Sequence, residues 1–203
     1  MGGSLSSPAR PVQVLMLGLD QAGKSSVLAR LAGEEVRSLT PTRGFSIHML
    51  NIAGSSQPTF KVWDLGGGHD VRHYWPAYYS RAQAIVFVVD ATDRRRLHET
   101  SVVLQQLLDE ESLLGLPLLL FANKQDMPHA LQAGEVRQAR RSIHAAPSLE
   151  TPCANSSLPC AQLEEVLHLG SIKDRAWLCF ACSALRGSGL NEGFVWLRSA
   201  ASP

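Results

Sequence analysis

The sequence has little of several features that mark particular classes of protein. Lys and Arg number 19 among its 203 residues and Asp and Glu number 18, so the formal net charge is only +1. The longest basic run is Arg94-Arg95-Arg96. A chain with so little excess charge lacks the basic surface that binding to nucleic acid requires. We therefore expect no nucleic-acid partner.

Long apolar runs and cysteines are also scarce. The longest apolar stretch, near Leu113 to Ala122, is too short for a bilayer and contains Pro117, and the N-terminus has no secretory apolar segment. The chain has four cysteines, which without a signal peptide indicate free thiols in a reducing compartment. These features together predict a cytoplasmic protein.

Two of the cysteines, Cys179 and Cys182, have the Cys-x-x-Cys spacing of zinc or redox sites. They lie in an apolar strand pattern, in which this spacing places the two side chains on opposite faces. Buried thiols are therefore favoured over a metal site.

A phosphate-binding pattern organises the N-terminal part of the chain. Residues 18–25 read Gly-Leu-Asp-Gln-Ala-Gly-Lys-Ser, a complete G-x-x-x-x-G-K-[ST] loop. The apolar run Val12 to Leu17 precedes it and a helical pattern follows, which is the strand–loop–helix setting that the motif requires. The loop's backbone N–H groups would face an anion, with Lys24 at the β- and γ-phosphates and the Ser25 hydroxyl on Mg²⁺.

A second phosphate-site element follows a predicted hairpin. Two β-type runs, Ser46 to Ile52 and Thr59 to Leu65, flank a Gly/Ser/Pro loop. The second run ends in Trp-Asp-Leu-Gly-Gly at residues 63–67. Asp64 would hold Mg²⁺ through water, and the Gly67 N–H would contact the γ-phosphate.

The C-terminal half carries a candidate base site. An uninterrupted apolar run from Ala84 to Asp90 predicts a strand buried on both faces of a parallel sheet. The next apolar run, Leu116 to Ala122, ends in Asn-Lys-Gln-Asp at residues 123–126, where ligands of open α/β sheets bind.

Guanine fits this tetrapeptide chemically. The Asp126 carboxylate can accept hydrogen bonds from guanine N1–H and the 2-amino group, a pairing that adenine does not offer. Asn123 would tie the segment to the phosphate loop and reach N7, and the Lys124 stem would lie over the ring. After a strand at Ala176 to Ala181, Ser183 and Ala184 form a loop whose Ala184 N–H would bond guanine O6.

These elements, in this order, resemble the ADP-ribosylation-factor-like branch of the Ras-type small GTPases. The branch-specific patterns are Gly-Leu-Asp at 18–20, Pro-Thr-x-Gly-Phe at 41–45, Trp-Asp-x-Gly-Gly at 63–67 and Asn-Lys-Gln-Asp at 123–126. The resemblance covers residues 12 to about 132 and about 161 to 198. It implies an α/β fold, the small G domain of P-loop NTPases, with a mostly parallel six-stranded sheet and helices on both faces.

The resemblance also implies the site. Thr42 would be the switch I residue that ligates Mg²⁺ and senses the γ-phosphate, and residues 66 to about 79 would be switch II. Phe45, Trp63 and Tyr78 would form the effector-binding cluster, with plain core packing as the alternative for each ring. The expected GTP-binding residues are Gly18, Leu19, Asp20, Gln21, Ala22, Gly23, Lys24, Ser25, Ser26, Thr42, Gly67, Asn123, Lys124, Asp126, Ser183 and Ala184, and the expected metal-binding residues are Ser25, Thr42 and Asp64.

Three features depart from the family pattern. Gly68 stands where the family usually has the Gln that orients the attacking water, so we expect slow GTP hydrolysis. His69 and Arg43 are weak candidates to replace that Gln. About ten polar residues stand where the family has an amphipathic N-terminal helix. The stretch from about Gly134 to Cys160 has no expected counterpart, and we predict a disordered insertion whose first half, Glu135 to Ile143, can be helical.

The remaining expectations concern domains, lipid and partners. We expect a flexible segment at residues 1–11 and one G domain at 12–199. Met1, Gly2 and Ser6 match the N-myristoylation pattern, and an ordinary terminus is the alternative. Acylation at Gly2 would give weak peripheral membrane association. Effectors, an exchange factor and an activating protein are the expected partners.

The sequence is compatible with three functions. The first is a GTP/GDP switch that recruits effectors when GTP is bound. The second is an effector-binding scaffold that stays locked in the GTP form. The third is an ATP-dependent kinase or ATPase, which shares only the phosphate loop and is opposed by Asn123 and Asp126.

Overall fold

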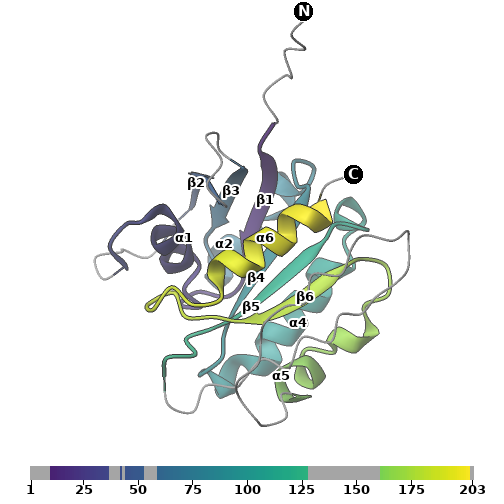
Figure 1. Cartoon of the computed structure of the whole chain (residues 1–203). Coiled ribbons are helices and arrows are strands. Elements are labelled where there is room, and N and C mark those ends of the chain that lie inside the picture. Colours follow the sequence, from purple (N-terminus) through teal and green to yellow (C-terminus); the bar gives the residue numbers. More distant parts are fainter. Residues whose placement is uncertain (1–9, 37–41, 43, 53–58, 128–160, 202–203) are drawn as a thin grey trace, which may run out of the picture.

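The computed structural model describes residues 10–36, 42, 44–52, 59–127 and 161–201. A six-stranded sheet of order β2-β3-β1-β4-β5-β6 forms its centre (Figure 1). All neighbouring strands are parallel except β2 and β3, which form an antiparallel pair. The strands are β1 (Val12–Leu17), β2 (Phe45–Leu50), β3 (Phe60–Leu65), β4 (Ala84–Asp90), β5 (Leu118–Asn123) and β6 (Trp177–Ala181).

Helices cover both faces of this sheet. Two short 3₁₀ turns, η3 (Glu111–Leu113) and η4 (Leu169–Ser171), lie in connections. The α-helices are α1 (Lys24–Ala32), α2 (His69–Arg72), α3 (Pro76–Tyr79), α4 (Leu97–Leu108), α5 (Ala161–Val166) and α6 (Leu190–Ala201), and the 3₁₀ turn η2 (Arg94–Arg96) precedes α4. The predicted α/β class, with a mostly parallel six-stranded sheet, is confirmed.

The two faces of the sheet bury two separate apolar cores. One core joins the sheet to α4 and α5 through Leu104, Leu107 and Leu163. The other joins it to α1 and α6 through residues such as Leu28 and Phe194. Strands β4 and β5 contribute to both cores, which explains why their sequences are continuously apolar rather than alternating.

The cysteine pair follows the same division. Cys179 lies in the core under α4 and α5, whereas Cys182 lies in the core under α1 and α6. Both thiols are free and buried, and burial raises the pKa of Cys182. The two cysteines thus lie on opposite faces of the sheet, as the strand pattern predicts. Within the described ranges, no group of three or more His, Cys, Asp or Glu side chains is arranged to hold a metal ion.

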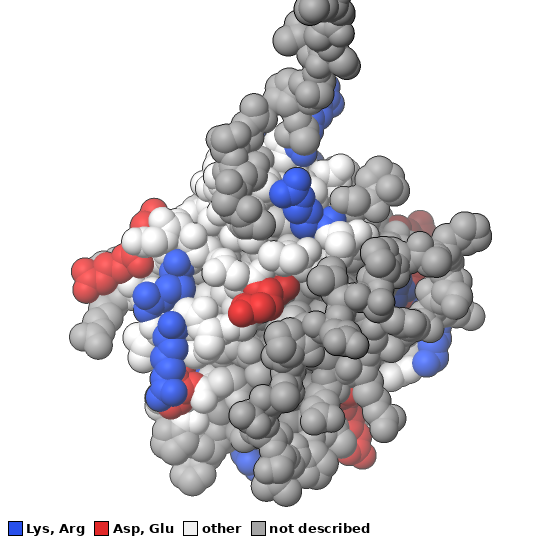
Figure 2. Space-filling model, viewed as in Figure 1, with Lys and Arg blue, Asp and Glu red and all other residues white. Residues whose placement is uncertain are grey.

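The surface of the described residues carries mixed charge. In the view of Figure 2, basic and acidic side chains are interspersed, without a broad patch of one sign among the described residues. None of the helices in this part of the chain is long and apolar enough to cross a membrane.

Candidate nucleotide-binding site

The phosphate loop connects the carboxyl end of β1 to the start of α1. Gly18 has φ +134°, and a Cβ there would lie 2.2 Å from the Val88 carbonyl oxygen. Gly23 has φ +92°, and a Cβ there would lie 2.4 Å from the Asn123 amide nitrogen. Both positions therefore require glycine, because a side chain would collide with β4 or with the base-site segment.

Lys24 lies inside the phosphate loop with only 6% of its surface exposed. Its ammonium donates hydrogen bonds to the carbonyl oxygens of Gly18 and Leu19, each at 2.9 Å. Burial lowers the pKa of Lys24 to about 8, against the opposing effect of the Asp64 and Asp20 carboxylates. A buried ammonium without a direct carboxylate partner is suited to an anion, and nucleotide phosphates would supply that charge.

Three oxygen-bearing side chains meet beside this lysine. The Ser25 hydroxyl donates to Asp64 Oδ2 at 2.5 Å, and Ser25 Oγ lies 2.8 Å from Thr42 Oγ1. Asp64 is fully buried, and its Oδ1 has no hydrogen-bond partner among the described residues. Burial raises the pKa of Asp64, and the Ser25 hydrogen bond and the Lys24 ammonium oppose that rise only in part.

These contacts fit a hard divalent cation. Hydroxyl and carboxylate oxygens are the ligands that Mg²⁺ takes in phosphate sites, and a buried carboxylate oxygen without a hydrogen-bond partner favours a positive charge nearby. The predicted metal residues Ser25, Thr42 and Asp64 therefore do lie together, although they come from α1, the segment before β2, and β3.

The segment after β3 lies directly against the phosphate loop. A Cβ on Gly67 would come within 2.3 Å of the Gly18 carbonyl oxygen, so only glycine fits there. The buried Trp75 indole donates to the Gly66 carbonyl oxygen at 2.8 Å, which fixes this turn from the α3 side. Gly68 has an ordinary φ of −64° and caps α2, and a Cβ there would meet nothing closer than Val71 at 3.8 Å.

A cavity of about 760 Å³ extends over these elements. The segment between β3 and α2 contributes Gly66, Gly67 and Gly68, and Asp70 and Val71 follow from α2. The remaining lining residues are Asp20, Gln21, Gly23, Lys24, Ser25, Ser26, Thr42 and Lys124. The cavity therefore covers the predicted phosphate and metal end of the site and reaches the predicted base end only at Lys124; Asn123, Asp126, Ser183 and Ala184 do not line it.

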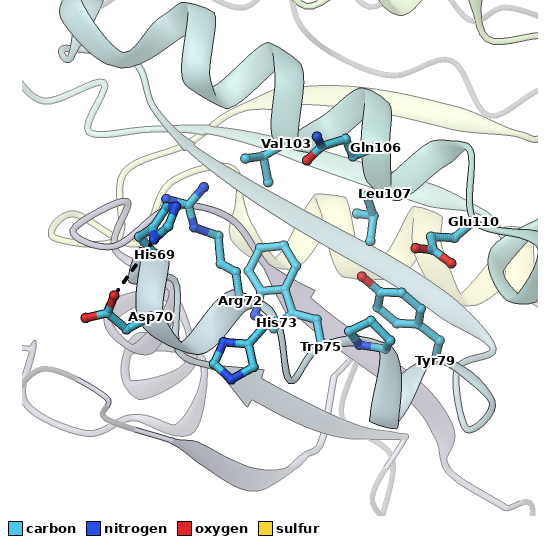
Figure 3. Close-up of a pocket in the computed structure, with 11 residues that line it drawn as sticks. His69, Asp70, Arg72, His73, Trp75, Tyr79, Val103, Gln106, Leu107 and Glu110 are labelled. Atoms are coloured by element: carbon cyan, nitrogen blue, oxygen red, sulfur yellow. Dashed lines mark ion pairs between the residues drawn. The ribbon is translucent and has the colours of Figure 1, made fainter.

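His69, the weak candidate for the water-orienting role, does not line that cavity. Its side chain is 92% exposed and lies 3.8 Å from the Asp70 carboxylate. Figure 3 shows it at a neighbouring groove of about 620 Å³ between α2, α3 and α4, which also contains Trp75, Tyr79 and Glu110. The other candidate, Arg43, lies outside the described residues.

The base end of the site is assembled from β5, β6 and the loops that follow them. The buried Asn123 amide donates to the Ala22 carbonyl oxygen at 2.9 Å, which is the predicted tie to the phosphate loop. Asn123 Oδ1 accepts the Ala184 N–H at 3.0 Å, and the Ser183 hydroxyl donates to Asp126. In this structure the Ala184 N–H thus faces Asn123, and its bond to guanine O6 stays a prediction.

Lys124 is held in place by a residue that the sequence analysis did not single out. Its ammonium lies 2.6 Å from Asp90 Oδ2. Burial opposes ionisation of Asp90, but hydrogen bonds from Lys124 and Thr92 lower its pKa below the usual value. Asp90 ends β4 and pairs with Asn123 at the end of β5. A polar residue at the end of the strand next to the tetrapeptide was therefore the sequence signal that could have identified Asp90.

Two arginines were also missed, and no motif marks either of them. Arg96 donates to the Asp20 carboxylate at 2.9 Å and to the Asp20 carbonyl oxygen at 3.2 Å, which ties the phosphate loop to η2. Arg30 of α1 donates to the carbonyl oxygens of Ala184 and Leu185. Both contacts join distant parts of the chain and became visible only in the tertiary structure.

The three predicted effector aromatics form one cluster beside the edge strand β2. The Phe45 ring centroid lies 6.0 Å from that of Trp63 and 5.3 Å from that of Tyr78, and Trp63 and Tyr78 are 5.7 Å apart. Phe45 is 52% exposed, whereas Trp63 is only 6% exposed. Trp63 therefore supports the cluster from below, and Phe45 presents most of its surface.

This sheet order, with a phosphate loop after β1 and the tetrapeptide Asn-Lys-Gln-Asp at the end of β5 and just after it, defines the class of small GTPases among P-loop proteins. Comparison with known proteins agrees with that class. The chain is 28% identical to the solved "Arl6 BBS3 Small GTPase from Trypanosoma brucei", which holds the nucleotide analogue GppNp; the match has a TM-score of 0.72 and covers 95% of this chain and 98% of the other.

The sequence comparisons give the family. The model of the ADP-ribosylation factor family matches residues 2–148 and 152–201. ADP-ribosylation factor-like protein 3 of Caenorhabditis elegans is 35% identical over 98% of this chain and 94% of its own length, and that of Chlamydomonas reinhardtii is 38% identical over 91% and 88%. ADP-ribosylation factor J of Dictyostelium discoideum is 38% identical over 96% and 87%.

The chain belongs to the ADP-ribosylation factor family and is a GTP-binding small GTPase. The predicted resemblance to the ADP-ribosylation-factor-like branch is therefore confirmed. The family match also runs through residues 134–148 and 152–160, which is nearly all of the stretch from about Gly134 to Cys160 that we expected to lack a counterpart. That stretch lies outside the described residues, as does Gly2.

Proposed function

We propose that this protein is a switch of the ADP-ribosylation-factor-like type that binds GTP or GDP with Mg²⁺ and recruits effector proteins in the GTP form. One observation carries the proposal: Thr42 lies 2.8 Å from Ser25 of the phosphate loop, and Ser25 in turn bonds to the buried Asp64. The segment before β2 is thus joined to the phosphate site, where the presence of a γ-phosphate can control its position.

Each part of the site has a separate role in this proposal. Lys24 and the loop N–H groups bind the phosphates, and Asp126, Asn123 and Ala184 select guanine. Ser25, Thr42 and Asp64 would hold Mg²⁺, which when bound neutralises charge between the phosphates and the protein. Gly67 lies against the phosphate loop, so a γ-phosphate there would also set the position of switch II.

The effector surface follows from this coupling. Thr42 precedes Phe45 by a short segment, and the Gly66 N–H donates to the Gly44 carbonyl oxygen at 2.8 Å. The nucleotide-sensing residues of both switches are therefore connected to the strand that presents Phe45. A partner that contacts Phe45 and Tyr78 would distinguish the GTP form from the GDP form.

A second function is favoured by one residue. Gly68 provides no side chain to orient a water molecule, and His69 lies at the neighbouring groove rather than in the cavity. A GTP-locked scaffold that binds effectors without cycling is therefore the alternative. Weak hydrolysis is expected in either case.

The nucleotide that co-purifies with the protein, identified by chromatography after denaturation, tests the proposal. GDP supports a cycling switch, and GTP supports the locked scaffold. ATP, or no retained nucleotide under conditions that preserve the fold, would contradict both.

We also propose that the protein is cytoplasmic. If Gly2 is myristoylated, a minor membrane-associated pool is expected, because one myristoyl chain gives only marginal binding.

A further inference from the structure

Arg30 of α1 contacts the loop that carries the proposed guanine-reading groups. Its Nε donates to the Ala184 carbonyl oxygen at 3.0 Å, and its Nη2 donates to the Leu185 carbonyl oxygen. Within the described part of the chain, no carboxylate lies within ion-pair distance of Arg30. The guanidinium is therefore used for two adjacent carbonyl groups, which its rigid fork of N–H donors matches.

The same loop is held on its other side by the base site. The Ala184 N–H donates to Asn123, and the Ser183 hydroxyl donates to Asp126. The peptide groups before and after Ala184 are thus each fixed by a distant side chain. Since Asn123 sets the direction of the N–H and Arg30 sets that of the C=O, neither peptide group can rotate without losing a hydrogen bond.

The stem of Arg30 also supports the loop by packing. Gly187 has φ +81°, and a Cβ built on it would lie 3.3 Å from Arg30 Cδ. The Gly187 N–H donates to the Ser183 carbonyl oxygen at 2.7 Å, which closes the turn over the arginine stem. The loop therefore rests on Arg30 as well as bonding to it.

The position of Arg30 links the two ends of the nucleotide site. It lies in the last turn of α1, the helix whose first residues are Lys24 and Ser25 of the phosphate loop. One rigid element thus positions both the phosphate-binding groups and the loop that faces the base. We propose that Arg30 is a positioning residue for guanine recognition: it holds the Ala184 loop beside Asn123, so that the Ala184 N–H can be shared between Asn123 and the O6 atom of a bound base.

This inference rests on the proposed guanine site and adds a specific expectation. Arg30→Met should release GDP about tenfold faster in the presence of Mg²⁺, because a hydrogen bond from a charged group is worth about a factor of ten. It should also reduce the preference for GDP over 6-thio-GDP, in which sulfur replaces O6. Arg30→Lys keeps the charge but not the fork, so it should be intermediate in both measurements.

Arg95→Met is the matched control, because it removes the same charge from an exposed arginine of η2. Both measurements use fluorescent-nucleotide displacement on the full-length protein. If Arg30→Met does not fold, as judged by thermal denaturation, Arg30→Lys alone carries the test. Unchanged release and base preference relative to Arg95→Met, or faster release with an unchanged GDP to 6-thio-GDP ratio, would overturn the inference.

Failure of the proposed base site would look different. In that case the wild type would bind no guanine nucleotide, or Asp126→Asn would bind GDP as tightly as the wild type. A wild type that prefers GDP and loses that preference in Asp126→Asn, combined with an unaffected Arg30→Met, would reject the role of Arg30 alone.

Discussion

At the scale of single residues, Asp126 has the most specific role in the proposed site. Its carboxylate accepts a hydrogen bond from Ser183. Asn123, three residues earlier in the same tetrapeptide, donates to the Ala22 carbonyl oxygen of the phosphate loop. A carboxylate offers only acceptors to guanine N1–H and the 2-amino group, whereas an amide also presents donors.

We expect Asp126→Asn to weaken GTP binding by several kcal/mol and to shift preference toward xanthine nucleotides, because a mismatched buried donor rejects the base strongly. Competition between GTP and XTP for the purified variant measures the shift. Retention of wild-type GTP affinity would show that Asp126 does not read the base.

Gly68 is the residue whose replacement tells most about hydrolysis. The space around it is open, with the nearest atom to an added Cβ at 3.8 Å, and its φ is −64°. The Cβ of a glutamine there would therefore meet no steric obstacle, and the backbone conformation is one that any residue adopts. Gly68 also loosens the segment, which should cost roughly 0.5 to 1 kcal/mol when the loop orders around GTP.

We expect very slow single-turnover hydrolysis by the wild type and a rate at least about tenfold higher in Gly68→Gln, because the side chain can orient the attacking water. His69→Ala is the matched variant, and it should hydrolyse GTP as slowly as the wild type. A fast wild type that His69→Ala inactivates would assign the role to His69 instead and would require α2 to turn inward.

At the scale of elements, the cation cluster depends on three segments that meet at the carboxyl ends of the strands. Ser25 begins α1, Asp64 lies in β3, and Thr42 precedes β2. The buried Asp64 carboxylate, whose Oδ1 has no hydrogen-bond partner among the described residues, and the nucleotide phosphates would repel each other without a cation between them.

We therefore expect chelation of Mg²⁺ by EDTA to speed nucleotide release by orders of magnitude, and restoration of free Mg²⁺ to reverse the effect. Displacement of a fluorescent nucleotide by excess GDP gives the rate in each condition. Equal rates with and without EDTA would mean that these oxygens do not hold a cation.

At the scale of the whole molecule, the stretch from about Gly134 to Cys160 lies between β5 and α5. The described elements end before it at Met127 and resume with α5 at Ala161. A long surface insertion costs little closure entropy.

Deletion of residues 134–160 should leave the protein folded, with nucleotide affinity within about threefold of wild type, a change of roughly 0.7 kcal/mol. Thermal denaturation and nucleotide titration of the deleted chain check this. Insoluble expression, or a much weaker affinity, would show that the stretch packs against the folded part, in line with a family match that covers residues 134–148 and 152–160.

The sequence by itself determined the order of the elements and the identity of the main motifs. Continuous apolar runs identified β4 and β5 because strands buried on both faces need apolar residues at every position. Gly18, Gly23 and Gly67 were predicted from the phosphate motifs, and the structure adds that only glycine fits at these three positions. The sequence did not determine where strands begin and end. The run predicted at Ser46 to Ile52 forms β2 at Phe45–Leu50, because pairing with β3 sets the ends of this strand.

Only the tertiary structure decided which side chains meet. Ser25, Thr42 and Asp64 were each predicted separately, but their contact depends on the packing of three segments. Arg30 and Ala184 are 154 residues apart in the chain, and no local pattern relates them. The exposure of His69 and the burial of Trp63 were likewise undecided, because whether a side chain faces a cavity, a core or solvent depends on neighbours that are distant in sequence.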